Sequence, residues 1–182
     1  IRLQPGIVGE RVNQILKPFG KKFPPDPASI KSAMVGGIIV NNASGMSCGT
    51  RENSYRMLIS TRIVLPDGSV LDTGDEESKA VFAKTHPEFL RKIEDLRDEI
   101  HKDETLHRLI EKKYQIKNVT GLSINSFIDF DDPFDIIAHL MVGSEGTLAF
   151  LSEAVLKTTT DYPYKASAMA YLANMHLACE TV

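Results

Sequence analysis

Two adjacent glycines, Gly36 and Gly37, lie in a stretch whose residue types suit anion binding. Successive backbone N–H groups at such glycines can point into one concavity, and concavities of this kind bind phosphate groups. Asn and Ser side chains follow at 41–45 and can exchange hydrogen bonds with hydroxyl groups and ring edges. The stretch predicts a site for a phosphate-bearing ligand, although a plain loop of turn residues explains the same composition equally well.

A second glycine-rich segment, Gly143-Ser144-Glu145-Gly146, joins an expected helix to an expected strand. By itself it indicates only a helix stop and a turn. No G-x-G-x-x-G follows an expected strand, so the sequence does not support a Rossmann dinucleotide site. No G-x-x-x-x-G-K-[ST] occurs, which excludes a P-loop.

Composition narrows the class of protein further. The 182 residues carry a formal net charge of -3, so no strong positive field would attract nucleic acid. Cys48 and Cys179 form no cluster of the kind that iron–sulfur or zinc sites need, and we expect no metal in this chain. We expect a reducing, cytoplasmic setting, with peripheral attachment to the inner face of the cell membrane left open. No apolar stretch reaches the roughly 18 residues that a transmembrane helix requires.

Hydrophobic periodicity and turn residues predict an α+β fold, with a mixed or antiparallel sheet flanked by helices. A β-hairpin is expected around the turn 66–69, with Met57, Ile59, Thr61, Ile63 and Leu65 on one face. The other expected elements are a helix over 5–19 that starts at Pro5 and ends at Gly20, a strand or helical turn over 34–40, a helix from Asp132 to Gly143, strands over 147–158 and 165–172, and a helix from Asn174.

A charged, helical insertion is expected over about 77–116, on the surface of the protein. Thr85 and Glu88 fit a capping box, and Asp103 is placed to cap a later helix. Asp131 or Asp132 is expected to cap the helix that follows.

Six segments occur in an order that carries a resemblance. They are Pro5-Gly6, Pro25-Asp26-Pro27-Ala28-Ser29, Gly36-Gly37, Asn41-Asn42-Ala43-Ser44-Gly45, Leu65-Pro66-Asp67-Gly68 and Gly143-Ser144-Glu145-Gly146-Thr147-Leu148. The series resembles the PCMH-type FAD-binding domain of the vanillyl-alcohol oxidase/PCMH flavoprotein superfamily. Within it the chain is most similar to the FAD-linked D-lactate/D-2-hydroxyglutarate dehydrogenases that are fused to an iron–sulfur module, on the phrases NNASGMSCGT and VGSEGTLAFLSE.

The resemblance implies FAD as the cofactor, held mainly by backbone groups. The segments 25–29 and 35–49 would line the pyrophosphate, the ribityl chain and the flavin ring, and 143–146 would lie near the adenosine and pyrophosphate end. Lys117-Asn118-Val119-Thr120-Gly121 resembles a stretch that lies near the flavin in relatives. The implied cofactor-binding residues are Pro25, Asp26, Pro27, Ala28, Ser29, Val35, Gly36, Gly37, Asn41, Asn42, Ser44, Gly45, Gly49, Gly143, Ser144, Glu145 and Gly146.

The resemblance also implies an activity: oxidation of a D-2-hydroxy acid, D-lactate or D-2-hydroxyglutarate, with hydride transfer to FAD. An iron–sulfur module or a quinone would accept the electrons. The chain is expected to be a fragment, with 1–163 as the second FAD-binding subdomain and 164–182 as the start of a substrate domain. The catalytic base and metal ligands are expected outside it, so no catalytic residue is assigned and the fragment alone is expected to be inactive. Two alternatives are another flavin oxidoreductase, such as a glycolate oxidase subunit, and an inactive fragment with an incomplete FAD site.

Three further side chains have two interpretations each. Arg51 and Arg56 follow the glycine-rich loop and could face a carboxylate, although solvated surface arginines are the commoner case. His139 lies in an apolar helix and is expected to be a hydrogen-bonded core residue rather than a base.

Overall fold

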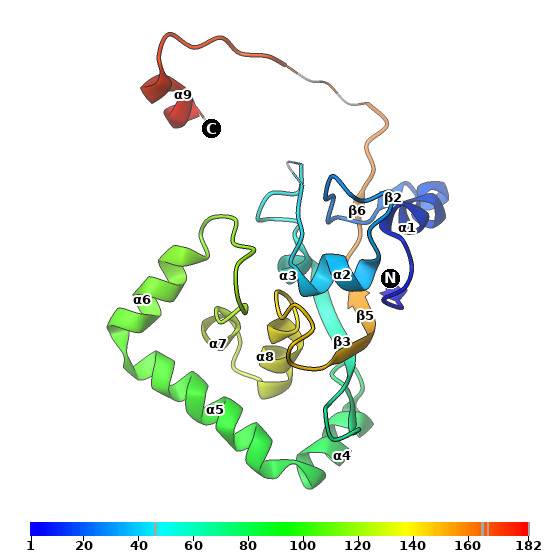
Figure 1. The fold of residues 1–182 in the computed structure, drawn as a ribbon, viewed down its shortest axis with the longest axis vertical. Helices are drawn as coiled ribbons and strands as arrows, with labels where there is room; N and C mark the ends of the chain where they lie inside the picture. The colour runs from blue at the N-terminus through cyan, green and yellow to red at the C-terminus, as the bar shows by residue number, and fades with distance from the viewer. Residues whose placement is uncertain (46, 165, 167, 182) are drawn as a thin grey trace.

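The computed structural model describes residues 1–45, 47–164, 166 and 168–181 (Figure 1). The strands are β1 (Arg2–Leu3), β2 (Lys21–Lys22), β3 (Leu58–Val64), β4 (Val70–Asp72), β5 (Phe150–Leu156) and β6 (Thr159–Thr160). The helices are α1 (Gly9–Leu16), the 3₁₀ turn η1 (Lys17–Phe19), α2 (Val35–Val40), α3 (Ser54–Met57), α4 (Glu76–Thr85), α5 (Pro87–Lys102), α6 (Glu104–Lys113), α7 (Ser126–Asp129), α8 (Pro133–Leu140) and α9 (Met175–Thr181).

An antiparallel sheet in the order β1-β5-β3-β4 forms the centre of the protein. The first and last thirds of the chain meet in it, because β1 pairs with β5 and the Ile1 amino group donates to the Leu156 carbonyl at 2.8 Å. A second, two-stranded sheet joins β2 to β6. The α+β expectation is confirmed, and of the two expected sheet types the antiparallel one forms.

The predicted hairpin is confirmed as β3 and β4, but one inward residue was predicted wrongly. Thr61 and Ile63 are each 1% exposed, as expected. Ile59 is 49% exposed, while its neighbour Leu58 is buried at 4%. The register of β3 against β5 shifts between Leu58 and Ser60, and such a bulge moves side chains to the opposite face of a strand.

The first helix begins later than the sequence indicated. Its first residue is Gly9 rather than Pro5, because the backbone of Pro5 and Ile7 is hydrogen-bonded to α2 instead. The carbonyls of Pro5 and Ile7 accept the N–H groups of Gly36 and Val35 at 2.9 and 2.8 Å. The predicted end is confirmed, since Gly20 takes the left-handed conformation with φ 64° directly after η1.

The predicted helical insertion is present as three helices, α4, α5 and α6, which follow one edge of the molecule (Figure 1). Asp103 caps α6 as expected, accepting the N–H groups of Thr105 and Leu106 at 3.0 Å each. The capping box was wrong: His86 is the N-cap of α5, and the Thr85 hydroxyl instead donates back to the carbonyl of Val81 in α4. Only His86 separates the end of α4 from Pro87, the first residue of α5, so Thr85 belongs to the earlier helix.

The core lies between the sheet and α8. Residues 136–140 of that helix are all buried, and the helix packs against β3. Its start is as predicted, because Asp132 accepts the N–H of Phe134 at 2.8 Å and Pro133 occupies the first helical position. The left-handed Gly143, at φ 82°, follows the helix, as the sequence indicated.

The expected strand over 165–172 is wrong for the residues that the structure describes there. Ala166 and 168–172 belong to no strand, and Lys165 and Ser167 lie outside the described residues. After β6 the chain runs away from the body of the protein, so this stretch has no neighbouring strand to pair with (Figure 1). Tyr171 is accordingly 91% exposed. The expected terminal helix is confirmed as α9, and the domain boundary at 163/164 stays a prediction.

None of the helices among the described residues is long and apolar enough to cross a membrane.

Replacing the cap of α6 should cost stability. Asp103→Ala removes a side chain that satisfies two backbone N–H groups, and we expect a loss of about 1 kcal/mol in the free energy of unfolding. Asp95→Ala, at an exposed position inside α5, is the matched control and should change it by less than about 0.5 kcal/mol. Urea denaturation followed by circular dichroism measures both, and equal effects would contradict the cap.

Candidate functional site

The two predicted loop segments, 25–29 and 41–49, are joined through one carboxylate. Asp26 Oδ1 accepts the backbone N–H of Gly45 at 3.0 Å and that of Cys48 at 3.2 Å. Gly45 has to be a glycine, because an added Cβ would overlap the Asp26 carbonyl oxygen and lie 2.6 Å from its carboxylate. The sequence placed both segments at one site, and the structure brings them into contact.

The hydrogen bonds to Asp26 affect its ionisation. Burial by itself would raise the pKa of this carboxyl, but hydrogen bonds from Cys48, Ser47 and Gly45 outweigh burial and hold the pKa below its usual value. The Cys48 thiol is buried beside this carboxylate, and burial first and hydrogen bonding to the Asp26 side chain second raise its pKa. At neutral pH the loop therefore holds a carboxylate and a neutral thiol.

The adjacent glycines Gly36 and Gly37 lie in the first turn of the short helix α2. Of the two structures expected for 34–40, a strand or a helical turn, the helical one forms. Gly36 packs so closely on Pro5 that an added Cβ would lie 2.6 Å from the proline Cβ. Gly37 is different, because nothing lies within 4 Å of its Cβ position. One glycine therefore allows close packing, and the other leaves open space over the backbone.

The turn 143–146 is attached to the end of α2. The backbone N–H of Glu145 donates to the Val40 carbonyl at 2.9 Å, and that of Gly143 to the Ile39 carbonyl at 3.4 Å. Glu145 holds a left-handed φ of 51°, which is uncommon outside glycine, between the left-handed Gly143 and Gly146. The two glycine-rich segments of the sequence therefore lie side by side, although more than 100 residues separate them along the chain.

An apolar hollow of about 450 Å³ lies where these segments meet. It brings together three predicted residues, Gly36, Gly37 and Gly146. Met34 and Phe150 lie on it, and they are 56% and 66% exposed. The complete lining is Pro5, Gly6, Met34, Gly36, Gly37, Val40, Gly146, Ala149, Phe150 and Leu151.

Other predicted residues do not line this hollow. Ala28 and Ser29 are exposed in a tight turn, in which the Ser29 carbonyl accepts the N–H groups of Ser32 and Ala33. Asn41 is exposed, and Gly49 has a left-handed φ of 49°. The residues with roles in packing or turns are Pro25, Pro27 and Val35, which are buried, and Ser144, whose carbonyl and hydroxyl both accept hydrogen bonds within its own turn.

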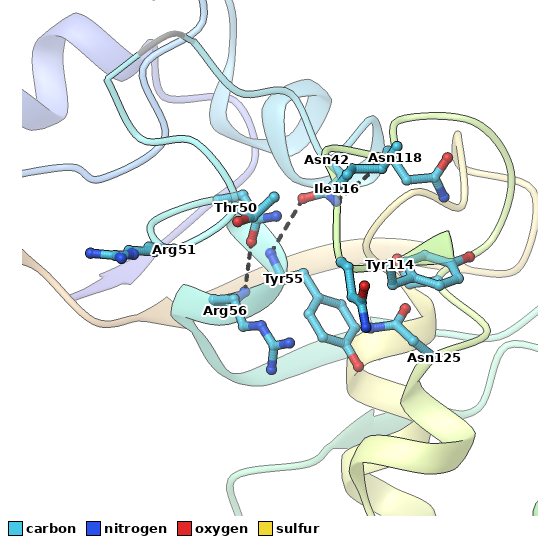
Figure 2. A pocket seen from close by; sticks show the side chains of 12 residues that line it. Asn42, Thr50, Arg51, Tyr55, Arg56, Tyr114, Ile116, Asn118 and Asn125 are labelled. Carbon is cyan, nitrogen blue, oxygen red and sulfur yellow. Dashed lines mark hydrogen bonds between the residues drawn. The ribbon is translucent and has the colours of Figure 1, made fainter. Parts of the chain in front are cut away.

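A second, polar cavity of about 380 Å³ lies beyond the end of α2 (Figure 2). Asn42 forms one wall; its Oδ1 accepts the N–H of Tyr55 at 3.4 Å and its Nδ2 donates to the Asn118 carbonyl at 3.4 Å. Lys117 extends the same contact, because its Nζ donates to the Ser44 carbonyl at 2.7 Å. The 117–121 segment, which resembles a flavin-proximal stretch, thus packs on the 41–45 loop.

Arg51 and Arg56 both line this polar cavity (Figure 2). Its rim is further organised by Asp129, a residue to which the sequence assigned no role. Asp129 Oδ2 accepts the Tyr55 hydroxyl at 2.8 Å and Asn125 Nδ2 at 3.0 Å, and lies 3.8 Å from Arg56. Burial first, and then the charge of Asp129, raises the pKa of Tyr55 far above its usual value, so its hydroxyl is a permanent donor. Only the fold could identify Asp129, because 74 residues separate it from Tyr55.

His139 is a core residue, as expected. It is 5% exposed, its ring stacks on Phe130 at 4.1 Å, and its Nδ1–H donates to the Asp135 carbonyl at 2.8 Å. Burial lowers the pKa of His139, which keeps the imidazole neutral. Among the described residues, no three His, Cys, Asp or Glu side chains are grouped so that they could hold a metal ion.

Comparison with known proteins identifies the first part of the chain. Residues 1–74 match the FAD binding domain family. The D-2-hydroxyglutarate dehydrogenase of Haemophilus influenzae is 30% identical over 160 residues, which are 86% of this chain and 16% of the relative. The glycolate oxidase subunit GlcD of Bacillus subtilis is 24% identical over 181 residues, 99% of this chain and 27% of that protein. A solved structure of alkyldihydroxyacetonephosphate synthase is 20% identical, with a TM-score of 0.46 over 87% of this chain and 19% of that chain.

The chain is related to FAD-dependent flavoproteins. The expected resemblance and the expected FAD cofactor are confirmed by the family match and the relatives. The chain spans only 16% of the Haemophilus relative, so the activity of a whole enzyme is a matter for proposal. The individual cofactor-binding residues stay predictions.

The contact between Gly45 and Asp26 predicts a contrast between two glycines of the same segment. Gly45→Ala would force the two loops apart, and we expect it to lower the free energy of unfolding by about 1–3 kcal/mol. Gly37→Ala, which has open space and a helical backbone, should raise it by a few tenths to about 1 kcal/mol. Urea denaturation of both variants measures the contrast, and equal changes would contradict the close contact.

The lowered pKa of Asp26 predicts a dependence of stability on pH. Because the carboxyl binds its proton less readily in the folded chain, its contribution is complete above the unfolded pKa of about 3.9 and is lost as pH falls through the folded pKa. Asp26→Asn removes this titration, so the variant should lose less stability between about pH 5 and pH 2 than the unaltered chain. Urea midpoints across that range test this, with Asp95→Asn as the control that should follow the unaltered chain.

Proposed function

We propose that this chain is the FAD-binding part of a flavin-dependent dehydrogenase that oxidises a D-2-hydroxy acid, D-lactate or D-2-hydroxyglutarate. The observation that carries the proposal is the meeting of Gly36, Gly37 and Gly146 at one apolar hollow. These glycines come from the two segments on which the resemblance to FAD-binding domains rests. The relatives add the substrate class, because their names contain D-2-hydroxyglutarate and glycolate, which are both 2-hydroxy acids.

The hollow suits a planar aromatic ring. Its walls are largely apolar side chains and glycine backbone, and a flat ring gains most from such a surface. Gly37 presents a backbone N–H that has no acceptor among the described residues, with no side chain to screen it. An apolar surface with an unpaired backbone N–H on it is what a flavin with its phosphate groups requires. Ser44 Oγ, in the neighbouring 41–45 loop, is buried and also has no hydrogen-bond partner in the described part of the chain.

The roles of the chain's own residues follow from these contacts. Asp26 holds the 41–49 loop in place through Gly45 and Cys48, so the open backbone is preorganised. The turn 143–146 fixes the C-terminal end of α2, because its N–H groups donate to the carbonyls of Ile39 and Val40. FAD supplies the hydride-accepting chemistry when it is bound. The protein supplies orientation and an apolar surface for the ring.

The remaining parts of the reaction belong outside this chain in our proposal. The base that removes the hydroxyl proton and any metal ligands would come from a substrate domain, of which 164–182 is the start, while 1–163 is the second FAD-binding subdomain. An iron–sulfur module or a quinone would accept the electrons from the flavin. We propose a cytoplasmic location, which the two free cysteines support, since disulfides persist in oxidising compartments.

A related flavin enzyme is the second candidate. The glycolate oxidase subunit GlcD matches 99% of the chain, a larger share than the Haemophilus relative does, and this favours glycolate as an alternative substrate. The two candidates use the same FAD site. They differ in the substituent on the hydroxyl-bearing carbon, so only substrate tests distinguish them.

Retention of FAD by the 182-residue chain tests the cofactor site. A graded series at Gly37 is expected to weaken FAD binding in proportion to side-chain size, with a small effect for Gly37→Ala and about tenfold for Gly37→Val, because both fill the open space on the hollow. Flavin absorbance after desalting and fluorescence titration with FAD measure the affinity. Unfolding curves recorded on the same samples control for loss of fold. Equal affinity across the series would remove Gly37 from the site.

The activity is tested on the longer protein that contains this chain. Anaerobic addition of D-lactate or D-2-hydroxyglutarate should bleach the flavin absorbance, whereas the L-enantiomers should not. Bleaching by glycolate alone would favour the second candidate. The absence of bleaching by every 2-hydroxy acid would refute the proposed reaction and leave the FAD site intact.

A further inference from the structure

The polar cavity differs in chemistry from the hollow assigned to the flavin. Its lining contains two arginines and five amide side chains but no acidic residue. Two positive charges on the lining face the single carboxylate of Asp129 at the rim, and this balance favours an anionic ligand.

Several side-chain donors that line this cavity have no close hydrogen-bond partner. Arg51 and Gln115 make no side-chain hydrogen bond or ion pair among the described residues, and Arg56 has one distant ion pair, at 3.8 Å from Asp129. Arginine forks match carboxylates in a bidentate geometry, so Arg56, which lies beside Tyr55 in Figure 2, is the natural anion-binding group of the cavity. Arg51 extends away from Tyr55 and Asn125 and contributes positive charge at the edge of the cavity.

Asn125, on the same cavity, has an acceptor atom that lacks a donor. This residue lines the cavity and is 4% exposed, and Asp129 fixes its orientation by accepting from Nδ2. Its Oδ1 is buried and has no hydrogen-bond partner among the described residues. A buried acceptor of this kind is unfavourable until a donor reaches it, and a ligand hydroxyl would be such a donor.

The cavity adjoins the segments assigned to the flavin. Asn42, which forms part of the wall, follows α2 by two residues, and Asn118 and Lys117 tie the same wall to the 41–45 loop. A ligand bound here would therefore lie next to the cofactor segments.

We propose that the polar cavity binds the 2-hydroxy acid substrate, with its carboxylate toward Arg56 and its hydroxyl donating to Asn125 Oδ1. This assignment rests on the proposed function, which supplies the hydroxy acid. The cavity itself contributes the residues that select for an anion carrying a hydroxyl group. It places substrate-binding residues within the FAD-binding part of the protein as well as in a following domain.

Isothermal titration of the 182-residue chain with D-2-hydroxyglutarate tests the proposal. Arg56→Met should weaken binding about tenfold, or about 1.4 kcal/mol, and Arg51→Met, which removes a more distant positive charge, should weaken it less. Arg51 has no partner among the described residues, so its replacement leaves no group unpaired in the fold. Arg108→Met, at an exposed position on α6 beside Glu104, is the control and should bind like the unaltered chain.

Three outcomes overturn the proposal: no binding by the unaltered chain, binding by Arg56→Met as tight as that of the unaltered chain, or equal affinity for the uncharged propane-1,2-diol. FAD retention recorded on the same samples separates the two hypotheses. Retained FAD without hydroxy-acid binding overturns the cavity assignment and leaves the flavoprotein function standing. Hydroxy-acid binding that depends on the arginines, in a chain that does not bind FAD, supports the cavity and contradicts the proposed cofactor site.

Discussion

One carboxylate holds together the part of the protein on which both cavities depend. Asp26 accepts two backbone N–H groups from a loop about twenty residues further along the chain, and the absence of a side chain at Gly45 allows the approach. The position of that loop decides where Asn42 and Ser44 lie, and these two residues receive the contacts of the 117–121 segment. A change at this one junction would therefore move the walls of the polar cavity together with the glycine-rich backbone.

Helix α2 links the two cavities and gives them different chemistry. Its glycines and Val40 lie on the apolar hollow, while Asn42, just past its end, lies on the polar cavity. Its last carbonyls accept N–H groups from the turn 143–146, and its first N–H groups donate to the carbonyls of Pro5 and Ile7, so two segments far apart in the chain fix its position. An apolar hollow beside a cationic, hydrogen-bonding cavity suits the proposed reaction between a ring cofactor and a small hydroxy acid.

Local signals in the sequence predicted the elements well where a few neighbouring residues decide the outcome. The caps at Asp103 and Asp132, the stop at Gly20 and the hairpin turn near Gly68 all formed as expected. The predictions failed where distant segments compete for the same groups. The backbone of Pro5 binds α2 rather than starting a helix, a bulge turns Ile59 outward, and the 165–172 stretch has no strand to pair with.

The sequence by itself determined the α+β class, the order of most elements and the relation to FAD-binding flavoproteins, because caps, turns and glycine-rich motifs act over a few residues. It also placed Gly36, Gly37 and Gly146 at one site through resemblance. Only the tertiary structure decided that these glycines surround an apolar hollow, and that Asp129 organises a separate polar cavity through Tyr55 and Asn125. Such contacts join residues far apart in the chain, and they form only when the sheet brings its first and last strands together.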